Sequence, residues 1–394
     1  MIKKVCAVVF LALIVTLGIG TSVRVVVKAL PEYLTWEGSR LSTLKTFVCD
    51  TDSNLQKQML FHGNWIDLFG GVMRLTGADT VADVEPQNQV YKMRNGSVTF
   101  ILGRKRPFDD GQLSAIRNLK SAADAAGAES WFVCIPQKIC TREKALGLSA
   151  RGAVDYAEQI DAYRMRTFEA AGYSVLDLHS AMHEKQSLHE QFFFKTDHHW
   201  TPEAGIWAAK KTAEALHIPV RKLDSMHFKP LVFFNMFLGS EGKRCGRLYC
   251  ACEDMSVPIP QTDMQFTVCS TDDPDKTGSF EDVMLFFKAY PKNEDVYDIN
   301  PYGLILHGDH AYVSIRNLQN PDGKRVLLIK DSFSNVIAPY LALVCGQVDL
   351  IDIREFEGSA ADWVRENKPD VVMVTMTARM SNDLFSFSGQ GSDS

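Results

Sequence analysis

Short, largely apolar segments alternate with segments of helical periodicity along much of this 394-residue chain. Apolar segments of this length, without a strict polar alternation, are typical of strands buried on both faces of a parallel sheet. Strand–helix alternation in turn places helices on the two faces of such a sheet. We therefore predict an α/β fold with a parallel sheet flanked by helices. The expected strands are residues 131–135, 174–178, 325–330, 348–353 and 370–376, and the expected helices are a segment ended by Gly127 and residues 155–171, 203–216, 335–345 and 361–367.

Residues 225–310 depart from this alternation. Phe, Gly, Pro and Cys gather there, and β-like runs occur at residues 265–268 and 283–287. Because the strand–helix rhythm resumes afterwards, we predict that this segment is an inserted β-rich lobe.

A hairpin is expected ahead of the first strand–helix unit. Asn95 and Gly96 lie between two β-prone runs, and this dipeptide is the strongest short-range signal for a hairpin, here over residues 90–100. We expect the catalytic domain to span residues 90–380 and a tail to follow at residues 381–394.

The first 28 residues differ in character from the rest. Lys3 and Lys4 precede an almost wholly apolar, uncharged stretch at residues 5–23. About 20 apolar residues span a bilayer, whereas the apolar core of a signal peptide has roughly 7–15. We predict a signal-anchor or transmembrane segment at residues 1–28 and a juxtamembrane region at residues 29–89, with the rest of the chain outside the cytoplasm. Small residues near the end of the stretch leave cleavage and secretion open as an alternative.

The composition excludes some classes of partner. The net charge is −6, and no run of Lys and Arg is longer than three residues, so the electrostatic footprint of a nucleic-acid-binding protein is missing. Nine cysteines are present, and Cys245, Cys250 and Cys252 lie close together. Their spacing favours structural or disulfide-bonded cysteines over a zinc site, because paired Cys-x2-Cys knuckles are absent. We expect neither a metal nor a cofactor.

One short motif combines a carboxylate with two imidazoles. Asp197, His198 and His199 immediately precede Thr201 and Pro202, which are a typical helix N-cap and first helical residue. Residues two apart in an extended backbone point the same way, so Asp197 can orient His199 as a general base while His198 points elsewhere. The alternative is a polar loop whose histidines only cap the helix.

The candidate nucleophile lies far downstream. Ser332 directly follows the predicted strand at residues 325–330, and open α/β sheets place chemistry at the carboxyl ends of their strands. Backbone amides at the start of the following helix could then stabilise an oxyanion. The alternative is that Asp331 and Ser332 only cap that helix. Further candidates for contacts with the substrate or the oxyanion are Asn335, Arg244, Ser240 and His198.

Together these segments resemble a known family. Residues 193–202, preceded by residues 135–138 and followed by residues 239–240 and 328–335, look like those of the bacterial DHHW-motif proteins, which are similar to SGNH-like O-acetyltransferases that acetylate alginate. The resemblance covers roughly residues 60–380. It implies an SGNH-hydrolase-like sheet flanked by helices, with an acid and a base that precede the serine in sequence. It also implies a ping-pong reaction through an acetyl-serine.

We accordingly expect an extracytoplasmic O-acetyltransferase that uses Ser332, His199 and Asp197 to move an acetyl group onto hydroxyls of a cell-surface polysaccharide. A membrane acyltransferase is the expected source of acetyl groups, and the N-terminal helix the expected membrane contact. Two alternatives stay open: a carbohydrate O-acetyl esterase with the same triad, and a non-catalytic protein of cell-envelope assembly.

Overall fold

The computed structural model describes residues 15–25, 27, 59–83, 88–105, 107–183, 186–289 and 295–389. Within these ranges we find no helix that combines the length and the apolar character needed to cross a membrane. The first 14 residues of the predicted anchor and most of the predicted juxtamembrane region lie outside the described residues.

Among the described residues, eight strands form one central sheet in the order β5-β4-β13-β11-β12-β10-β8-β9. The five strands from β5 to β12 are parallel to one another, whereas β10, β8 and β9 pair in antiparallel fashion. The bounds are β4 Glu129–Cys134, β5 Ser174–Asp177, β8 Phe266–Ser270, β9 Lys276–Gly278, β10 Tyr312–Asn317, β11 Arg325–Lys330, β12 Gln347–Asp352 and β13 Val371–Thr375.

The central strand β11 shows why the parallel part is apolar on both faces. Successive side chains of a strand point to opposite faces, and here Val326 and Leu328 enter one hydrophobic core while Leu327 and Ile329 enter the other. All four side chains are buried. The continuous apolar run in the sequence thus reflects two cores, as predicted.

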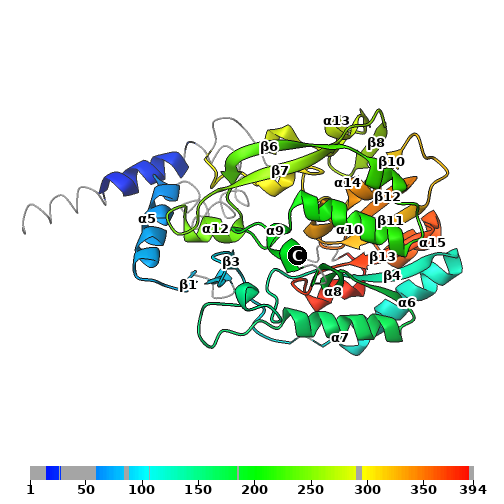
Figure 1. Ribbon diagram of the computed structural model, residues 1–394, viewed down its shortest axis with the longest axis horizontal. Helices are drawn as coiled ribbons and strands as arrows, with labels where there is room; N and C mark the ends of the chain where they lie inside the picture. Colours follow the sequence, from blue (N-terminus) through cyan, green and yellow to red (C-terminus); the bar gives the residue numbers. More distant parts are fainter. Residues whose placement is uncertain are drawn as a thin grey trace, which may run out of the picture.

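Helices cover the two faces (Figure 1). On one face, α10 packs against α14 over the first core; on the other, α6 packs against α15 over the second. Two predicted helix boundaries have a local cause: Gly127 ends α6 with a φ of 73°, and Thr201 caps α10 ahead of Pro202. The bounds are α6 Asp110–Ala126, α7 Ala157–Ala170, α8 Leu178–His183, α9 Gln186–Gln191, α10 Pro202–Ala215, α11 Arg221–Ser225, α14 Ala338–Leu341 and α15 Ala360–Asn367.

The structure corrects the predicted sheet, which is mixed rather than parallel. Residues 225–310, predicted as an inserted lobe, contribute to two sheets. β8 and β9 extend the central sheet, while β6 Phe228–Phe237 and β7 Glu253–Pro260 form a long two-stranded ribbon above it (Figure 1).

Two further predictions, at residues 283–287 and 335–345, were wrong. The segment at residues 283–287, predicted as a strand, begins inside helix α13 Phe280–Met284, which a capping box of Ser279 and Asp282 starts. The predicted helix at residues 335–345 is shortened to α14, which follows a 3-10 turn at Ser332–Asn335.

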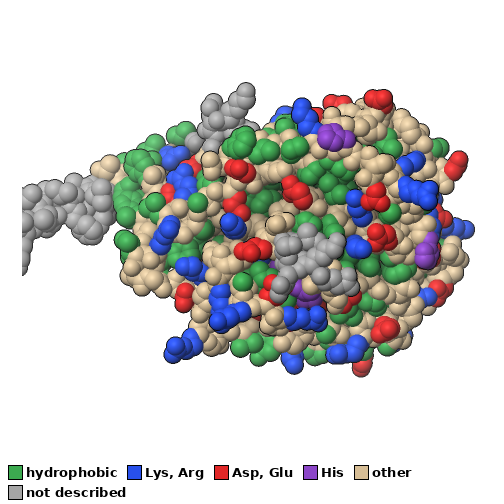
Figure 2. Space-filling view, viewed as in Figure 1, with side chains coloured by type: hydrophobic (Ala, Val, Ile, Leu, Met, Phe, Trp, Pro, Cys, Tyr) green, Lys and Arg blue, Asp and Glu red, His purple; other side chains and the backbone are tan. Residues whose placement is uncertain are grey.

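Smaller elements surround one end of the sheet. The predicted hairpin is confirmed: β2 Val90–Lys92 pairs with β3 Val98–Thr99, and Gly96 in the turn has a φ of 88°. β1 Thr80–Val81 adds a third strand to this sheet. α5 His62–Leu75 packs against α12 Ser240–Cys245. On the face shown in Figure 2, basic and acidic side chains are interspersed among apolar ones.

Candidate active site

Ser332 lies at the carboxyl end of the central strand β11, where the chain turns into the short 3-10 helix. Asp331 holds this turn: its Oδ1 accepts a hydrogen bond from Phe333 N at 3.1 Å, and its Oδ2 accepts one from Thr377 N at 2.7 Å. Asp331 is fully buried, whereas Ser332 is half-buried. The carboxylate therefore fixes the turn and leaves the serine accessible.

The turn that carries Asp197 and His199 is held against the serine turn. Trp200 is fully buried, and its Nε1 donates a hydrogen bond to Phe333 O at 2.9 Å. On its other side, Phe194 N donates to His199 O at 3.3 Å. The tryptophan of the motif thus anchors it to the residue next to Ser332.

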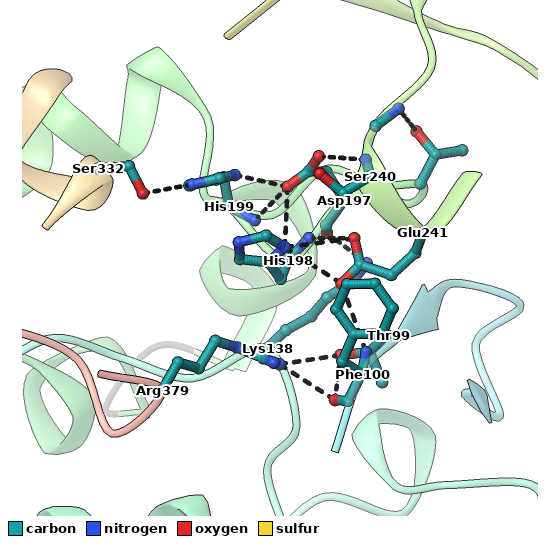
Figure 3. A network of polar contacts seen from close by, with 12 residues as sticks. Thr99, Phe100, Lys138, Asp197, His198, His199, Ser240, Glu241, Ser332 and Arg379 are labelled. Carbon is teal, nitrogen blue, oxygen red and sulfur yellow. Dashed lines mark hydrogen bonds and ion pairs between the residues drawn. The ribbon is translucent and has the colours of Figure 1, made fainter. Parts of the chain in front are cut away.

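Asp197, His199 and Ser332 form one hydrogen-bonded chain (Figure 3). Asp197 Oδ1 lies 2.6 Å from His199 Nδ1, and His199 Nε2 lies 2.7 Å from Ser332 Oγ. Asp197 Oδ1 also accepts a hydrogen bond from His199 N at 2.9 Å. The Tyr302 ring stacks on the His199 imidazole with centroids 4.1 Å apart, which fixes the ring plane. The structure therefore brings together the three residues predicted to act in catalysis.

The second oxygen of Asp197 is held by helix α12. Ser240 N donates a hydrogen bond to Asp197 Oδ2 at 2.7 Å. A Cβ atom on Gly239 would lie only 2.3 Å from Asp197 Cβ and 2.4 Å from its Oδ2. Glycine is therefore required for the backbone to approach the carboxylate, and Ser240 contributes its amide rather than its hydroxyl.

Residue alternation predicted that His198 points away from this hydrogen-bonded chain, and the structure shows that this prediction was wrong. Its Nδ1 lies 3.3 Å from Glu241 and 3.4 Å from Asp197 Oδ1. The rings of His198 and His199 are 4.0 Å apart. Glu241, which is fully buried, also accepts a hydrogen bond from His198 N at 3.0 Å. The tight turn, unlike a strand, brings both imidazoles to the same carboxylate.

These contacts determine the charges. Burial lowers the pKa of His199, and the charge of His198 lowers it further against the opposing effect of Asp197. Burial would raise the pKa of Asp197, but the charges of His199 and His198 outweigh it and hold that pKa below its ordinary value. Burial would lower the pKa of His198, but Glu241 and Asp197 raise it above its ordinary value. At neutral pH the site therefore pairs a neutral His199 with an ionised Asp197.

Lys138 binds the backbone of the turn that carries Asp197 and His199. Its Nζ donates hydrogen bonds to Val98 O at 2.6 Å, Lys195 O at 3.0 Å and Asp197 O at 2.8 Å. Figure 3 shows Lys138 beside Asp197. Only 3% of Lys138 is exposed, and burial lowers its pKa to about 8. Lys138 therefore has a structural role, because its ammonium group donates hydrogen bonds to three backbone carbonyl oxygens.

The end of β3 closes another side of the site. Arg379 Nη2 donates hydrogen bonds to Phe100 O at 3.1 Å and to Thr99 Oγ1 at 3.3 Å (Figure 3). Phe100 N donates to Glu241 at 3.4 Å, and the Phe100 ring lies 6.1 Å from that of His198.

Asn335 and Arg244, which were also predicted to contact the substrate or the oxyanion, bind groups outside this hydrogen-bonded chain. Asn335 Nδ2 donates to Gly308 O at 3.1 Å and to Asp309 Oδ1 at 2.9 Å, so its amide hydrogens hold a neighbouring loop instead of facing Ser332. Phe333 N is likewise occupied by Asp331.

Arg244 does not contact the hydrogen-bonded chain either. Its guanidinium pairs with Asp83 at 3.2 Å, donates to Ser240 O at 2.9 Å and lies over the ring of Phe100. Arg244 lies in helix α12, whose N-cap is Gly239.

Sequence reasoning missed two acids that hold the motif, the fully buried Glu241 and the half-buried Glu253. Besides Glu241, Glu253 accepts hydrogen bonds from Lys195 N and Thr196 N, both at 2.7 Å. They lie on α12 and β7, and no spacing rule links these elements to the motif.

A metal ion does not suit this site, although Asp197, His198 and His199 place ligand atoms within 4.8 Å of one another. Hydrogen bonds at 2.6 and 2.7 Å occupy both ring nitrogens of His199.

The cysteines of the described residues are all free thiols, which leaves the disulfide expectation for Cys245, Cys250 and Cys252 without support there. Cys250 and Cys252 instead line a surface cavity of about 700 Å³ that also reaches Lys195 and Thr196. Cys6 and Cys49 lie outside the described residues.

Two family models match the chain. One describes an SGNH hydrolase-like domain of the acetyltransferase AlgX and matches residues 103–230; the other describes DHHW proteins and matches residues 177–350. Among curated proteins, the alginate biosynthesis protein AlgX of Pseudomonas putida is 28% identical over 107 residues, which are 26% of this chain and 22% of that protein. The chain therefore matches less than a quarter of the length of this relative.

Solved structures share the fold. A DHHW family protein from Eubacterium siraeum superposes with a TM-score of 0.56 at 18% identity, over 79% of this chain and 98% of that one. Bacillus cereus PatB1, solved with a sulfonyl adduct, gives a TM-score of 0.58 at 17% identity, over 76% of this chain and 99% of that one. The predicted resemblance to DHHW proteins and SGNH-like acetyltransferases is thus confirmed.

Proposed function

We propose that this protein is an SGNH-type O-acetyltransferase that acts outside the cytoplasm on hydroxyls of a cell-surface polysaccharide. The hydrogen-bonded chain from Asp197 through His199 to Ser332 is the observation that carries this proposal. A serine hydroxyl becomes nucleophilic when an oriented imidazole accepts its proton, and these three residues have that geometry. The match to the AlgX acetyltransferase domain favours acetyl as the transferred group.

In the first half-reaction, Ser332 Oγ attacks the carbonyl carbon of an acetyl ester donor while His199 Nε2 accepts the hydroxyl proton. The tetrahedral intermediate then expels the donor alcohol, which takes the proton from His199, and acetyl-Ser332 remains. Asp197 holds the ring in the required orientation and stabilises the transient imidazolium.

In the second half-reaction, a sugar hydroxyl gives its proton to His199 and attacks the acetyl-serine. The bond between the acetyl group and Ser332 Oγ breaks, the serine regains its proton from His199, and the sugar leaves as an acetyl ester. No net proton or electron is gained or lost.

The setting of the reaction is part of the proposal. The apolar stretch at residues 5–23, flanked by Lys3 and Lys4, supports an anchored chain whose remainder faces the outside. A membrane acyltransferase would then supply acetyl groups to this side of the membrane. The name of the alginate relative supports a polysaccharide acceptor.

Release of acetate from a chromogenic acetyl ester tests the nucleophile. Ser332→Ala should abolish turnover by the purified protein, whereas Ser121→Ala, on the exposed face of α6, should leave it unchanged. Undiminished turnover by the Ser332 variant would refute the assignment. If a serine-directed covalent probe fails to label Ser332 in the folded protein, the non-catalytic alternative is favoured.

Water and sugar compete for the same acyl-enzyme, and the half-buried position of Ser332 leaves it open to both. Mass spectrometry of an oligosaccharide incubated with the protein and an acetyl donor separates the two activities. Gain of acetyl by the oligosaccharide supports the transferase, whereas loss of acetyl from an acetylated oligosaccharide supports the esterase.

A further inference from the structure

A second cluster of chemistry-bearing side chains lies apart from the hydrogen-bonded chain. Cys140, in the loop between β4 and α7, faces His179 and His183, which are four residues apart on helix α8. Cys140 is fully buried, and the side chains of His179 and His183 are 12% and 7% exposed. A helix places residues i and i+4 on one face, so both imidazoles point to the same side.

The cluster is poorly satisfied as a hydrogen-bond network. His179 Nδ1 and His183 Nε2 are buried without a hydrogen-bond partner among the described residues. The other ring nitrogens, which face the acids and the thiol, have contacts of 3.5 to 3.7 Å: His179 Nε2 lies 3.6 Å from Glu158, and His183 Nδ1 lies 3.5 Å from Glu143 and 3.7 Å from Cys140 Sγ. Good N–H···O hydrogen bonds span about 2.7–3.2 Å. Buried polar groups are seldom left in this state.

The same distances fit ligands that share one metal ion. Cys140 Sγ lies 3.7 Å from His183 Nδ1, and one ligand atom from each of Cys140, His179 and His183 lies within 4.8 Å of the others. With Zn–S of about 2.3 Å and Zn–N of about 2.05 Å, two ligands of a tetrahedral zinc ion are roughly 3.6 Å apart. A set of thiolate and imidazole ligands also favours zinc over magnesium or calcium.

We propose that Cys140, His179 and His183 bind one zinc ion. A carboxylate completes the tetrahedron, and Glu143 is placed for this role by its contact with His183. Glu158 is already held by Thr141 N at 2.9 Å and thus ties the cysteine loop to α7. Binding displaces the thiol proton of Cys140 to solvent.

The ion would brace the loop that supports the candidate active site. The His189 ring stacks on that of His183 with centroids 4.8 Å apart, and His189 Nε2 lies 3.0 Å from Lys138 O. Lys138 Nζ in turn donates to Asp197 O. The proposed metal is therefore structural, because its ligands do not reach Ser332.

Two other groups of side chains among the described residues bring potential ligand atoms equally close, but they are already satisfied. In the group of Asp273, His307 and His310, both ring nitrogens of His310 have partners, at 2.6 and 3.0 Å. In the candidate active site the same is true of His199. The cluster at Cys140 differs because the ring nitrogens that face Cys140, Glu143 and Glu158 have contacts of 3.5 to 3.7 Å, which are longer than ordinary N–H···O hydrogen bonds.

Metal analysis and cobalt substitution of the full-length chain test the site. We expect about one zinc per chain by elemental analysis, and a thiolate-to-cobalt charge-transfer band when Co²⁺ replaces it. Cys140→Ser should remove the band, and His179→Asn and His183→Asn should each weaken zinc binding roughly tenfold or more. The matched controls Cys269→Ser and His227→Asn, outside the cluster, should bind like the parent.

Absence of the cobalt–thiolate band from the parent protein, or its survival in Cys140→Ser, would overturn the proposal. Because a ligand variant can fail to fold, the parent is also tested alone: removing metal with a chelator should lower its Tm, and adding Zn²⁺ should restore it. A Tm that does not respond to zinc would count against the site. Ser332→Ala should bind zinc like the parent, so failure of the zinc site and failure of the proposed activity are separable.

Discussion

His199 Nε2 lies 2.7 Å from Ser332 Oγ, although 133 residues separate the two in sequence. The contact joins the turn before α10 to the end of the central strand β11. It depends on the neighbouring bond from Trp200 to Phe333 O, which fixes the two turns relative to each other. The contact between His199 and Ser332 is thus held in place by the packing of the two turns.

The first prediction concerns the pH dependence of ester cleavage. Burial and the charge of His198 hold the pKa of His199 below the ordinary value of 6.5. The base works when neutral, so activity should be lost only as the pH falls through this lowered pKa. A profile of kcat/KM for a chromogenic acetyl ester should therefore have its acidic midpoint below 6.5. A midpoint above that value would contradict the account of the site's charges.

Replacement of His198 should move that midpoint. Its pKa is raised by Glu241 and Asp197, so it carries positive charge that lowers the pKa of His199. His198→Asn removes the charge, and the pKa of His199 should rise. The acidic midpoint of kcat/KM should shift to higher pH, whereas an unchanged or lower midpoint would exclude electrostatic coupling of the two imidazoles.

Gly239→Ala should impair the site by displacing Asp197. The added Cβ would lie 2.3 Å from Asp197 Cβ, so either the carboxylate or the start of α12 must move. Misplacement of an orienting group by about 1 Å can cost a hundredfold, and we expect kcat/KM to fall by roughly tenfold to a hundredfold. Gly103→Ala is the matched control because nothing lies within 4 Å of its Cβ position. Equal activities of the two variants would disprove the close approach.

Lys138→Met should destabilise the fold. The lost ammonium serves three carbonyls, and buried acceptors without a donor cost free energy. We expect the free energy of unfolding, measured with urea, to fall by about 3 kcal/mol. Lys222→Met, at an exposed position of α11, should change it by less than about 0.5 kcal/mol. Equal decreases in the free energy of unfolding of the two variants would show that the hydrogen bonds of Lys138 do not stabilise the fold.

Much of the parallel sheet and several turns and helix caps could be predicted because the signals are local. The apolar run of β11, the cap at Thr201 and the Asn95-Gly96 turn each act within a few residues. The place of Ser332 followed from the rule that open α/β sheets put chemistry at strand ends, and its pairing with His199 followed from the residue types that a nucleophilic triad needs.

Other features depended on contacts that no local pattern encodes. Glu241 and Glu253 reach the motif from α12 and β7, 43 and 57 residues away. The β-like run of β8 was predicted, but its antiparallel pairing with β10 was not, because that pairing is set by tertiary context. The cluster at Cys140 was overlooked because its three potential ligands come from two segments that only the fold brings together.

We propose that Ser332 carries the acetyl group during turnover. The most direct test is mass spectrometry of the protein quenched in acid after mixing with a chromogenic acetyl ester without a sugar acceptor. We predict one added acetyl group on the peptide that contains Ser332, and none in Ser332→Ala. Acetylation confined to other residues, with full turnover by Ser332→Ala, would contradict the account.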